Sequence, residues 1–309
     1  MPRTGFKAAG TTLAALCLFP FVTSSATSAV AAPAQPAAPS PKAEVFFDDF
    51  SGAELDRSKW KVEVTGDNFT TVNSEQQAYV DSPETIYIDH DDANTGAENG
   101  ALALHARSTP GFQAPDGNTY DFQSGRVNTQ DNFEFTYGRY SAKVKLPEGG
   151  TSQGLWPAWW SLGANIDEVS WPQCGEVDVM ESVGEPWTSV ALHGPEYHGD
   201  TPIAGQQQFE GSDPGDWHVF TADWTPEGIT FLVDDAEIYK ITKAEMEQNG
   251  WTWVYDDPQF MILNFALGGQ FPNGVNGVTE PYFGLPQESV DKVKAGNARY
   301  LVDWVRVEQ

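Results

Sequence analysis

The chain has 309 residues and a formal net charge of −27, with 44 acidic side chains against 17 basic ones. Such a surface repels nucleic acid, anionic membranes and sulfated polysaccharides, so it favours a neutral partner and no nucleic-acid or membrane partner. The two cysteines exclude a disulfide framework, because Cys17 lies in the N-terminal leader described next and leaves Cys174 alone. We expect a monomer.

The first 31 residues have the layout of a secretory signal peptide. Arg3 and Lys7 form a charged start, residues 11–22 are mostly apolar, and small residues at 29–31 offer a cleavage site. Residues 32–43 are rich in Pro and Ala, which predicts a disordered tether. No later apolar run approaches the length of a membrane span, so we expect a secreted, extracellular protein.

Residues 44–309 contain no linker, repeat or low-complexity segment, and their number suits a single domain. Short apolar stretches alternate with Gly, Pro, Asn and Asp turns, which indicates an all-β fold, a sandwich or jelly roll. The predicted strands are Val45–Phe50, Thr85–Asp89, Ala101–Ala106, Phe122–Thr129, Gly138–Lys145, Leu155–Leu162, Glu176–Glu181, Ser189–His193, Trp217–Trp224, Gly228–Val233, Gln259–Ala266 and Arg299–Val307. Helical periodicity is found at Thr242–Gly250 and, more weakly, at Glu288–Ala295.

The segment 175–181, Gly-Glu-Val-Asp-Val-Met-Glu, places three carboxylates within six residues. Its valines favour a strand, on which Glu176 and Asp178 point to the same face because side chains alternate. Glu181 would then point to the opposite face. A β-bulge near residues 179–180 adds one residue and returns Glu181 to the face of the other two carboxylates.

Two interpretations of this segment are open. An amphipathic edge strand with a solvated acidic face would need no function. A bulged strand would bring Glu176 and Glu181 to one place with Asp178 between them, and two carboxyls about 5–5.5 Å apart are the apparatus of a retaining glycosidase. The segment alone does not decide between the two, but further motifs favour the second.

These motifs follow one another along most of the chain. They are Asn73-Ser74-Glu75-Gln76-Gln77-Ala78-Tyr79, Ser124-Gly125-Arg126, Tyr137-Gly138-Arg139-Tyr140, Gly154-Leu155-Trp156-Pro157-Ala158-Trp159-Trp160-Ser161-Leu162-Gly163, Ala191-Leu192-His193-Gly194, Asp223-Trp224, Ile262-Leu263-Asn264-Phe265-Ala266-Leu267-Gly268-Gly269 and Val302-Asp303-Trp304-Val305-Arg306-Val307. Together with the acidic segment they resemble glycoside hydrolase family 16, in its branch of laminarinase-like retaining endo-β-glucanases, over nearly all of residues 45–309.

The resemblance implies a β-jelly-roll sandwich of two curved antiparallel sheets with a substrate cleft on its concave face. It implies Glu176 as nucleophile, Glu181 as general acid/base and Asp178 as their helper, with no cofactor for catalysis. The bulged spacing is shared by laminarinases, agarases, carrageenases and β-1,3-galactanases, whereas lichenases have one residue fewer. The segment therefore indicates the mechanism better than it indicates the sugar.

Three residues are expected to line the cleft near the catalytic carboxyls. Trp156 and Trp160 lie four positions apart, hence on one face of a strand, and indole rings suit the apolar face of glucose. Packing in the core is the alternative for both. His193 resembles a histidine that lines the family's cleft near the acid, and a core position is again the alternative.

The resemblance also implies contacts farther along the cleft. Arg126 and Asn73 match positions that hydrogen-bond sugar hydroxyls on the non-reducing side, although a turn role suits Asn73 nearly as well. Phe271 stands where laminarinases usually have a tryptophan. The following segment, residues 272–298, is longer than usual and rich in Gly, Asn and Pro, and we expect a loop at one end of the cleft.

A structural calcium is the one metal that the resemblance implies. Asp303 resembles an aspartate that binds calcium on the convex face, with the carbonyls of Asp49 and Gly100 as companions, and calcium takes such oxygen ligands. An ordinary strand-end aspartate is the alternative. The remaining histidines, at positions 90, 105, 198 and 218, show no ligand spacing, so we expect no catalytic zinc.

The leading hypothesis is a secreted endo-glycosidase that hydrolyses internal β-1,3-glucosidic bonds of neutral β-glucan, of the laminarin type, through a covalent glycosyl-enzyme. The same chemistry on β-1,3-galactan or another neutral β-glycan is an alternative, and so is a cell-wall transglycosylase. A glycan-binding module without catalysis is a further class. The intact Glu176 and Glu181 argue against it, because binding alone needs no acid/base pair.

Overall fold

The computed structural model describes residues 42–91, 95–97, 99–209 and 213–309, and Lys42–Gln309 form one compact unit. The predicted signal peptide, residues 1–31, and nearly all of the predicted tether, residues 32–43, lie outside the described residues. Within the described part of the chain, every helix is too short or too polar to cross a membrane.

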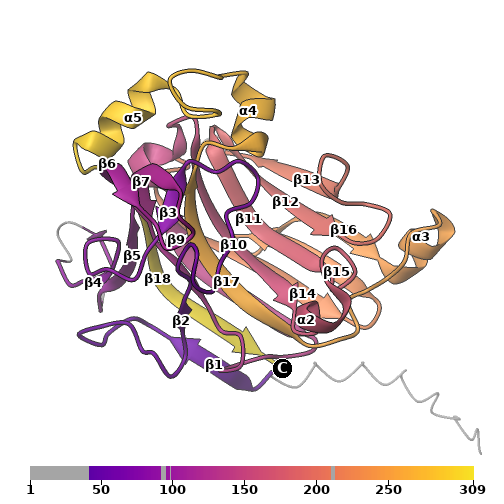
Figure 1. Cartoon of the computed structure of the whole chain (residues 1–309). Coiled ribbons are helices and arrows are strands. Elements are labelled where there is room, and N and C mark those ends of the chain that lie inside the picture. Colours follow the sequence, from indigo (N-terminus) through magenta and orange to yellow (C-terminus); the bar gives the residue numbers. More distant parts are fainter. Residues whose placement is uncertain (1–41, 92–94, 98, 210–212) are drawn as a thin grey trace, which may run out of the picture. The chain divides into compact units, whose positions relative to one another are not determined.

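Strands dominate the described residues, as Figure 1 shows. The strands are β1 (Glu44–Asp48), β2 (Lys61–Val62), β3 (Gln77–Tyr79), β4 (Ile86–Asp89), β5 (Ala101–His105), β6 (Arg107–Gln113), β7 (Thr119–Ser124), β8 (Arg126–Asn128), β9 (Gly138–Lys145), β10 (Leu155–Gly163), β11 (Glu176–Glu185), β12 (Trp187–His193), β13 (Ile203–Gln208), β14 (Trp217–Thr225), β15 (Gly228–Val233), β16 (Ala236–Thr242), β17 (Gln259–Leu267) and β18 (Arg299–Glu308). The helices are η1 (Pro147–Gly150), α2 (Ile166–Val169), α3 (Lys243–Gln248), α4 (Gln270–Asn276) and α5 (Gln287–Lys294).

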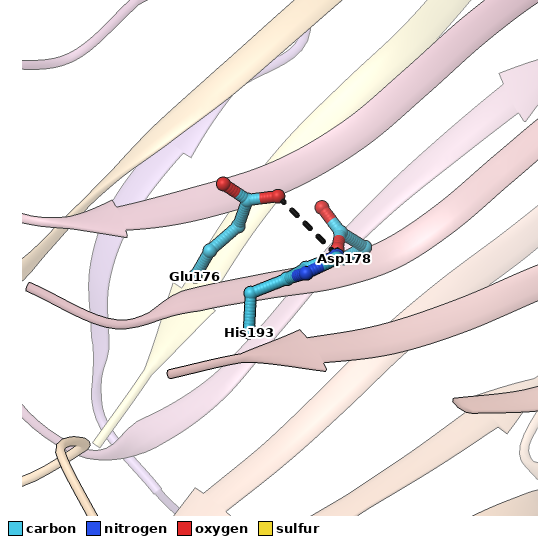
Figure 2. A group of neighbouring side chains, drawn as sticks. All are labelled: Glu176, Asp178 and His193. Carbon is cyan, nitrogen blue, oxygen red and sulfur yellow. Dashed lines mark ion pairs between the residues drawn. The ribbon is translucent and has the colours of Figure 1, made fainter. Parts of the chain in front are cut away.

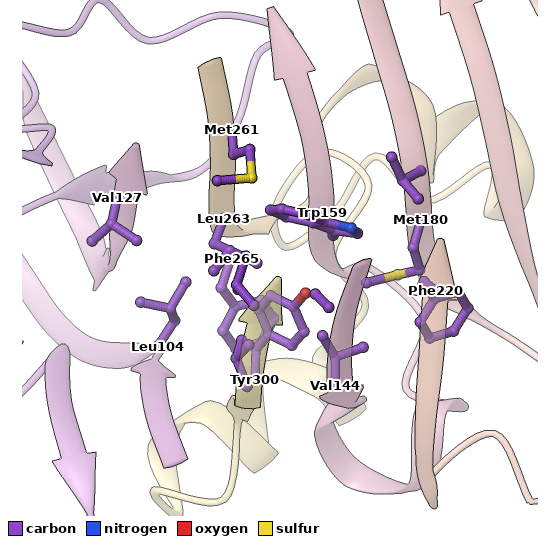
Figure 3. Packing of buried hydrophobic residues seen from close by; sticks show 14 of the residues in the cluster. Leu104, Val127, Val144, Trp159, Met180, Phe220, Met261, Leu263, Phe265 and Tyr300 are labelled. Atoms are coloured by element: carbon purple, nitrogen blue, oxygen red, sulfur yellow. The ribbon is translucent and has the colours of Figure 1, made fainter. Parts of the chain in front are cut away.

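Two antiparallel sheets contain most of these strands. One has the order β16-β15-β14-β9-β18-β5-β4, with β1 also paired to β18, and the other has the order β13-β12-β11-β10-β17-β8-β2. Their facing side chains form one hydrophobic core, in which Trp159 and Met261 of the second sheet pack with Val144 and Tyr300 of the first (Figure 3). The predicted all-β sandwich of two antiparallel sheets is thereby confirmed.

A third, small sheet was not predicted. It has the order β3-β7-β6 and contains a parallel pair, β3 with β7. The predicted single strand Phe122–Thr129 is wrong, because the chain breaks at Gly125 into β7 of the small sheet and β8 of the seven-stranded sheet. A Cβ atom at position 125 would lie 2.7 Å from the Ile86 side chain and 2.9 Å from the Leu104 side chain. Only glycine, which has no Cβ, fits at this position.

The segment expected to be an irregular loop, residues 272–298, contains most of α4 and all of α5. The sequence predicted α5 and α3, but not α4. Within this segment Tyr282 packs against Phe122 with ring centroids 4.8 Å apart and donates a hydrogen bond to Asp121. This part of the chain therefore fastens the small sheet to α4 and α5.

Candidate active site

The acidic segment forms the start of β11, between β10 and β12 of the seven-stranded sheet. Val179 and Met180 together lie opposite a single residue on each side, Trp159 of β10 and Val190 of β12. The side chains of both Val179 and Met180 are buried in the core. Two consecutive inward side chains are the mark of a β-bulge. The predicted bulge is confirmed, and it places Glu176, Asp178 and Glu181 on the outward face of the sheet.

The three carboxyls share a poorly solvated environment (Figure 2 shows two of them). Burial, together with the charge of Asp178, raises the pKa of Glu176 and the pKa of Glu181 to about 8. Burial likewise raises the pKa of Asp178, which a hydrogen bond with Glu176 lowers. Because like charges in one site oppose each other's ionisation, the cluster keeps protons near neutral pH.

Each of the two glutamates accepts a hydrogen bond from an indole N–H group. Trp171 Nε1 donates to Glu176 Oε2 at 2.9 Å, and Trp156 Nε1 donates to Glu181 Oε1 at 3.0 Å. Each bond favours the ionised carboxylate and lowers its pKa. Trp171 was missed in the sequence. It stands only five residues before Glu176, in the turn after α2, and nothing in its spacing indicates that its ring turns toward the carboxyl.

His193, at the end of β12, lies directly opposite Glu176 in the strand register. Its Nε2 atom is 3.3 Å from Asp178 Oδ2 and 3.7 Å from Glu176 Oε1 (Figure 2). It favours ionisation of both glutamates, lowering the pKa of Glu176 and of Glu181. The ligand atoms of His193, Glu176 and Asp178 lie within 4.8 Å of one another, close enough for a metal ion. The same three groups are the ones that the resemblance places at the catalytic end of the cleft.

Trp156 and Trp160 differ in their surroundings. Trp156 is only 8% exposed and packs against Phe271, with ring centroids 5.7 Å apart. Its indole N–H is directed at Glu181, so Trp156 contacts a catalytic candidate and leaves little ring surface for a sugar. Trp160 is half-buried, and its Nε1 donates to Asn264 Oδ1 at 2.6 Å. Trp159 between them points into the core.

Arg126 and Asn73 are positioned by contacts that the sequence did not reveal. Arg126 is buried, forms an ion pair with the buried Glu63, and lies over the Trp160 ring at 4.8 Å. Asn73 is exposed and has a left-handed backbone with φ of 55°, and its carbonyl accepts a hydrogen bond from Gln270 N at 2.7 Å. The contacts of Asn73 are those of a turn residue, one of its two expected roles.

Of the residues expected to bind calcium, Asp303 lies in β18, Asp49 directly follows β1 and Gly100 directly precedes β5. Strand β18 pairs with both β1 and β5. Gly100 approaches the neighbour of Asp49, because a Cβ there would lie 3.0 Å from the Phe50 carbonyl. Asp303 is buried, but its Oδ2 atom lies 2.7 Å from Lys143 Nζ. Asp303 thus has a cationic partner in the protein itself, which a calcium ion would have to share or displace, and the site remains a prediction.

Comparisons with known proteins agree with this geometry. The family model of Glycosyl hydrolases family 16 matches residues 65–280. The chain is 31% identical over 249 residues to glucan endo-1,3-beta-glucosidase A1 of Niallia circulans, covering 74% of this chain but only 34% of that protein. It is 30% identical over 274 residues to the beta-glucanase of Rhodothermus marinus, covering 84% of this chain and 82% of the relative.

A solved structure agrees as well. The endo-beta-1,3-glucanase from Pyrococcus furiosus superposes with a TM-score of 0.71 at 32% sequence identity, covering 86% of this chain and 94% of that one. The chain belongs to glycosyl hydrolase family 16.

Proposed function

We propose that this protein hydrolyses internal β-1,3-glucosidic bonds of neutral β-glucan with retention of anomeric configuration. The observation that supports this most directly is the bulge in β11, which turns Glu176, Asp178 and Glu181 to one face. A pair of carboxyls flanking the scissile bond is what retaining hydrolysis requires. The names of the relatives point to β-1,3-glucan, and the net charge of −27 favours a neutral polymer.

In the proposed mechanism the two glutamates take the roles that the resemblance to the family implies. Glu176, which accepts from Trp171 and faces His193, is the carboxylate that attacks the anomeric carbon. Glu181 holds its proton until it transfers it to the leaving glycosidic oxygen. In the second step Glu181 takes a proton from water, whose oxygen displaces Glu176 from the sugar and restores the original configuration. Asp178, which has a carboxyl oxygen within 4.8 Å of one of Glu176, is the helper that orients the nucleophile.

The protein's setting is part of the proposal. The N-terminal segment favours secretion into the extracellular space, and we place a monomer there with no cofactor for catalysis. A calcium ion at Asp303, with the carbonyls of Asp49 and Gly100, would tie the first and last strands together on the sheet that does not contain the carboxyls.

A panel of pure glycans tests the proposal. Residues 44–309 should cleave laminarin to oligosaccharides, cleave barley mixed-linkage glucan more slowly, and leave carrageenan intact. Glu176→Gln, which keeps the shape of the side chain, is the matched inactive control. Preference for β-1,3-galactan would overturn the sugar assignment, products longer than the substrate would indicate transglycosylation, and binding of laminarin without cleavage would leave only a binding module.

A further inference from the structure

A chain of buried hydrogen bonds starts at Trp160 and ends at Glu75. Trp160 Nε1 donates to Asn264 Oδ1 at 2.6 Å, and Asn264 Nδ2 donates to the Tyr79 hydroxyl at 3.0 Å. The Tyr79 hydroxyl donates to Glu75 Oε2 at 3.1 Å. Every donor points the same way, toward the carboxyl group. The catalytic mechanism uses none of Glu75, Tyr79 and Asn264.

The direction of this chain is set at its indole end. The Trp160 N–H can only donate, so the Asn264 carbonyl has to face it and the Asn264 amide nitrogen faces the Tyr79 hydroxyl. Because an amide nitrogen donates, the Tyr79 hydroxyl accepts from Asn264 and donates its own proton to Glu75. Tyr79 is fully buried, and Asn264 and Glu75 are 5% and 7% exposed, so water cannot easily replace a lost partner.

Other contacts anchor both ends. Gln77 Nε2 donates to Glu75 Oε2 at 2.7 Å, and Gln77 Oε1 accepts from Leu267 N at 2.7 Å, which fastens β3 to the end of β17. At the other end the Arg126 guanidinium covers the Trp160 ring. Trp160 itself lies opposite Asp178 in the strand register, so its ring stands beside the catalytic carboxyls.

We propose that Glu75, Tyr79 and Asn264 are positioning residues that hold the Trp160 indole in the orientation that binds a sugar ring next to the catalytic carboxyls. This inference rests on the proposed function, because it assumes that Trp160 contacts the substrate. It also assigns a purpose to the small sheet. Its strand β3 carries Tyr79, the middle of this hydrogen-bond relay from Trp160 to Glu75, and Gln77 of the same strand holds the Glu75 carboxyl.

The test compares two tyrosines that each lose one buried hydroxyl. Tyr79→Phe breaks the relay at its middle. Tyr197→Phe removes a comparable hydrogen bond, from the hydroxyl to the Thr252 carbonyl at 2.8 Å, outside the relay. Both variants should lose a similar amount of Tm. Only Tyr79→Phe should raise KM, by about tenfold or about 1.4 kcal/mol, with kcat changed less than threefold.

A double-mutant cycle shows whether the effect passes through the indole. Trp160→Phe keeps an aromatic ring but removes the N–H, so Tyr79→Phe should raise KM little further in that background. The kinetics use whichever glycan the wild type cleaves fastest, so a wrong sugar assignment does not affect the comparison. A crystal structure of Tyr79→Phe should show a rotated Trp160 ring or a flipped Asn264 amide. An unmoved ring with unchanged KM, or fully additive effects on KM, overturns the relay.

Discussion

Removing the indole N–H at either glutamate should move one limb of the pH profile and leave the other limb in place. The acid limb of kcat/KM reports the carboxyl that must be ionised in the free enzyme, which is Glu176 in our assignment. The alkaline limb reports the carboxyl that must be protonated, Glu181. Trp171→Phe removes the hydrogen bond to the first, and Trp156→Phe removes the bond to the second.

The size of each shift follows from the surroundings of the indole. A hydrogen bond to a charged group contributes about 1.5–3 kcal/mol, and one pKa unit corresponds to about 1.4 kcal/mol. Trp156 is 8% exposed, so its loss should raise the pKa of Glu181 and move the alkaline limb upward by about one unit. Trp171 is 41% exposed, and water partly replaces its N–H, so the acid limb should move upward by about half a unit.

The assay is the initial rate on a soluble β-glucan at substrate concentrations well below KM, measured across the pH range for the wild type and both variants. Limb positions report pKa values even when a variant binds substrate less well. If Trp156→Phe shifts the acid limb, or if neither variant moves its own limb, the roles given to the two glutamates are wrong.

Three further predictions concern the carboxyls and the metal. Glu176→Gly should lose several orders of magnitude in turnover, and added azide should restore activity by forming a glycosyl azide of inverted configuration; NMR of a product without inversion would contradict the assignment. The folded-state pKa of Glu181, about 8, exceeds its value of 4.5 in the unfolded chain, so stability should fall as pH rises between these values. Glu181→Gln should therefore have a higher Tm than the wild type at pH 8 and the same Tm at pH 4, whereas equal Tm differences at both would show that burial does not perturb Glu181. EDTA should lower Tm by several degrees without affecting activity at low temperature, and Asp303→Ala should behave like the chelated wild type; a Tm that ignores both changes would rule out the calcium.

Many strands of the two large sheets could be predicted, because their bounds depend on residues that are neighbours in the sequence. Strands such as Gly138–Lys145 and Gly228–Val233 agree with the structure to the residue, since turn residues bound an apolar stretch on both sides. The break at Gly125 could not be predicted, because its cause is the nearness of Ile86 and Leu104, about 20–40 positions away in sequence. The parallel pairing of β3 with β7 depends on the same tertiary packing.

The catalytic segment was predictable for a similar reason. The spacing of its three carboxylates within six residues indicates a bulge once the further motifs assign all three to one catalytic face. The supporting contacts were not predictable in this way. The hydrogen bond from Asn264 to Tyr79 joins residues 185 positions apart, and the ion pair of Arg126 with Glu63 joins residues 63 apart. Only the folded sheet brings such partners together.

The central claim is that Glu176 and Glu181 act on one glycosidic bond as nucleophile and acid/base. Proton NMR of the first minutes of laminarin-oligosaccharide hydrolysis, before the anomers equilibrate, tests it most directly. Our account predicts that the new reducing ends appear first as the β-anomer and later mutarotate to the equilibrium mixture. Early appearance of the α-anomer would mean direct attack by water, and it would contradict the covalent mechanism and the roles of both glutamates.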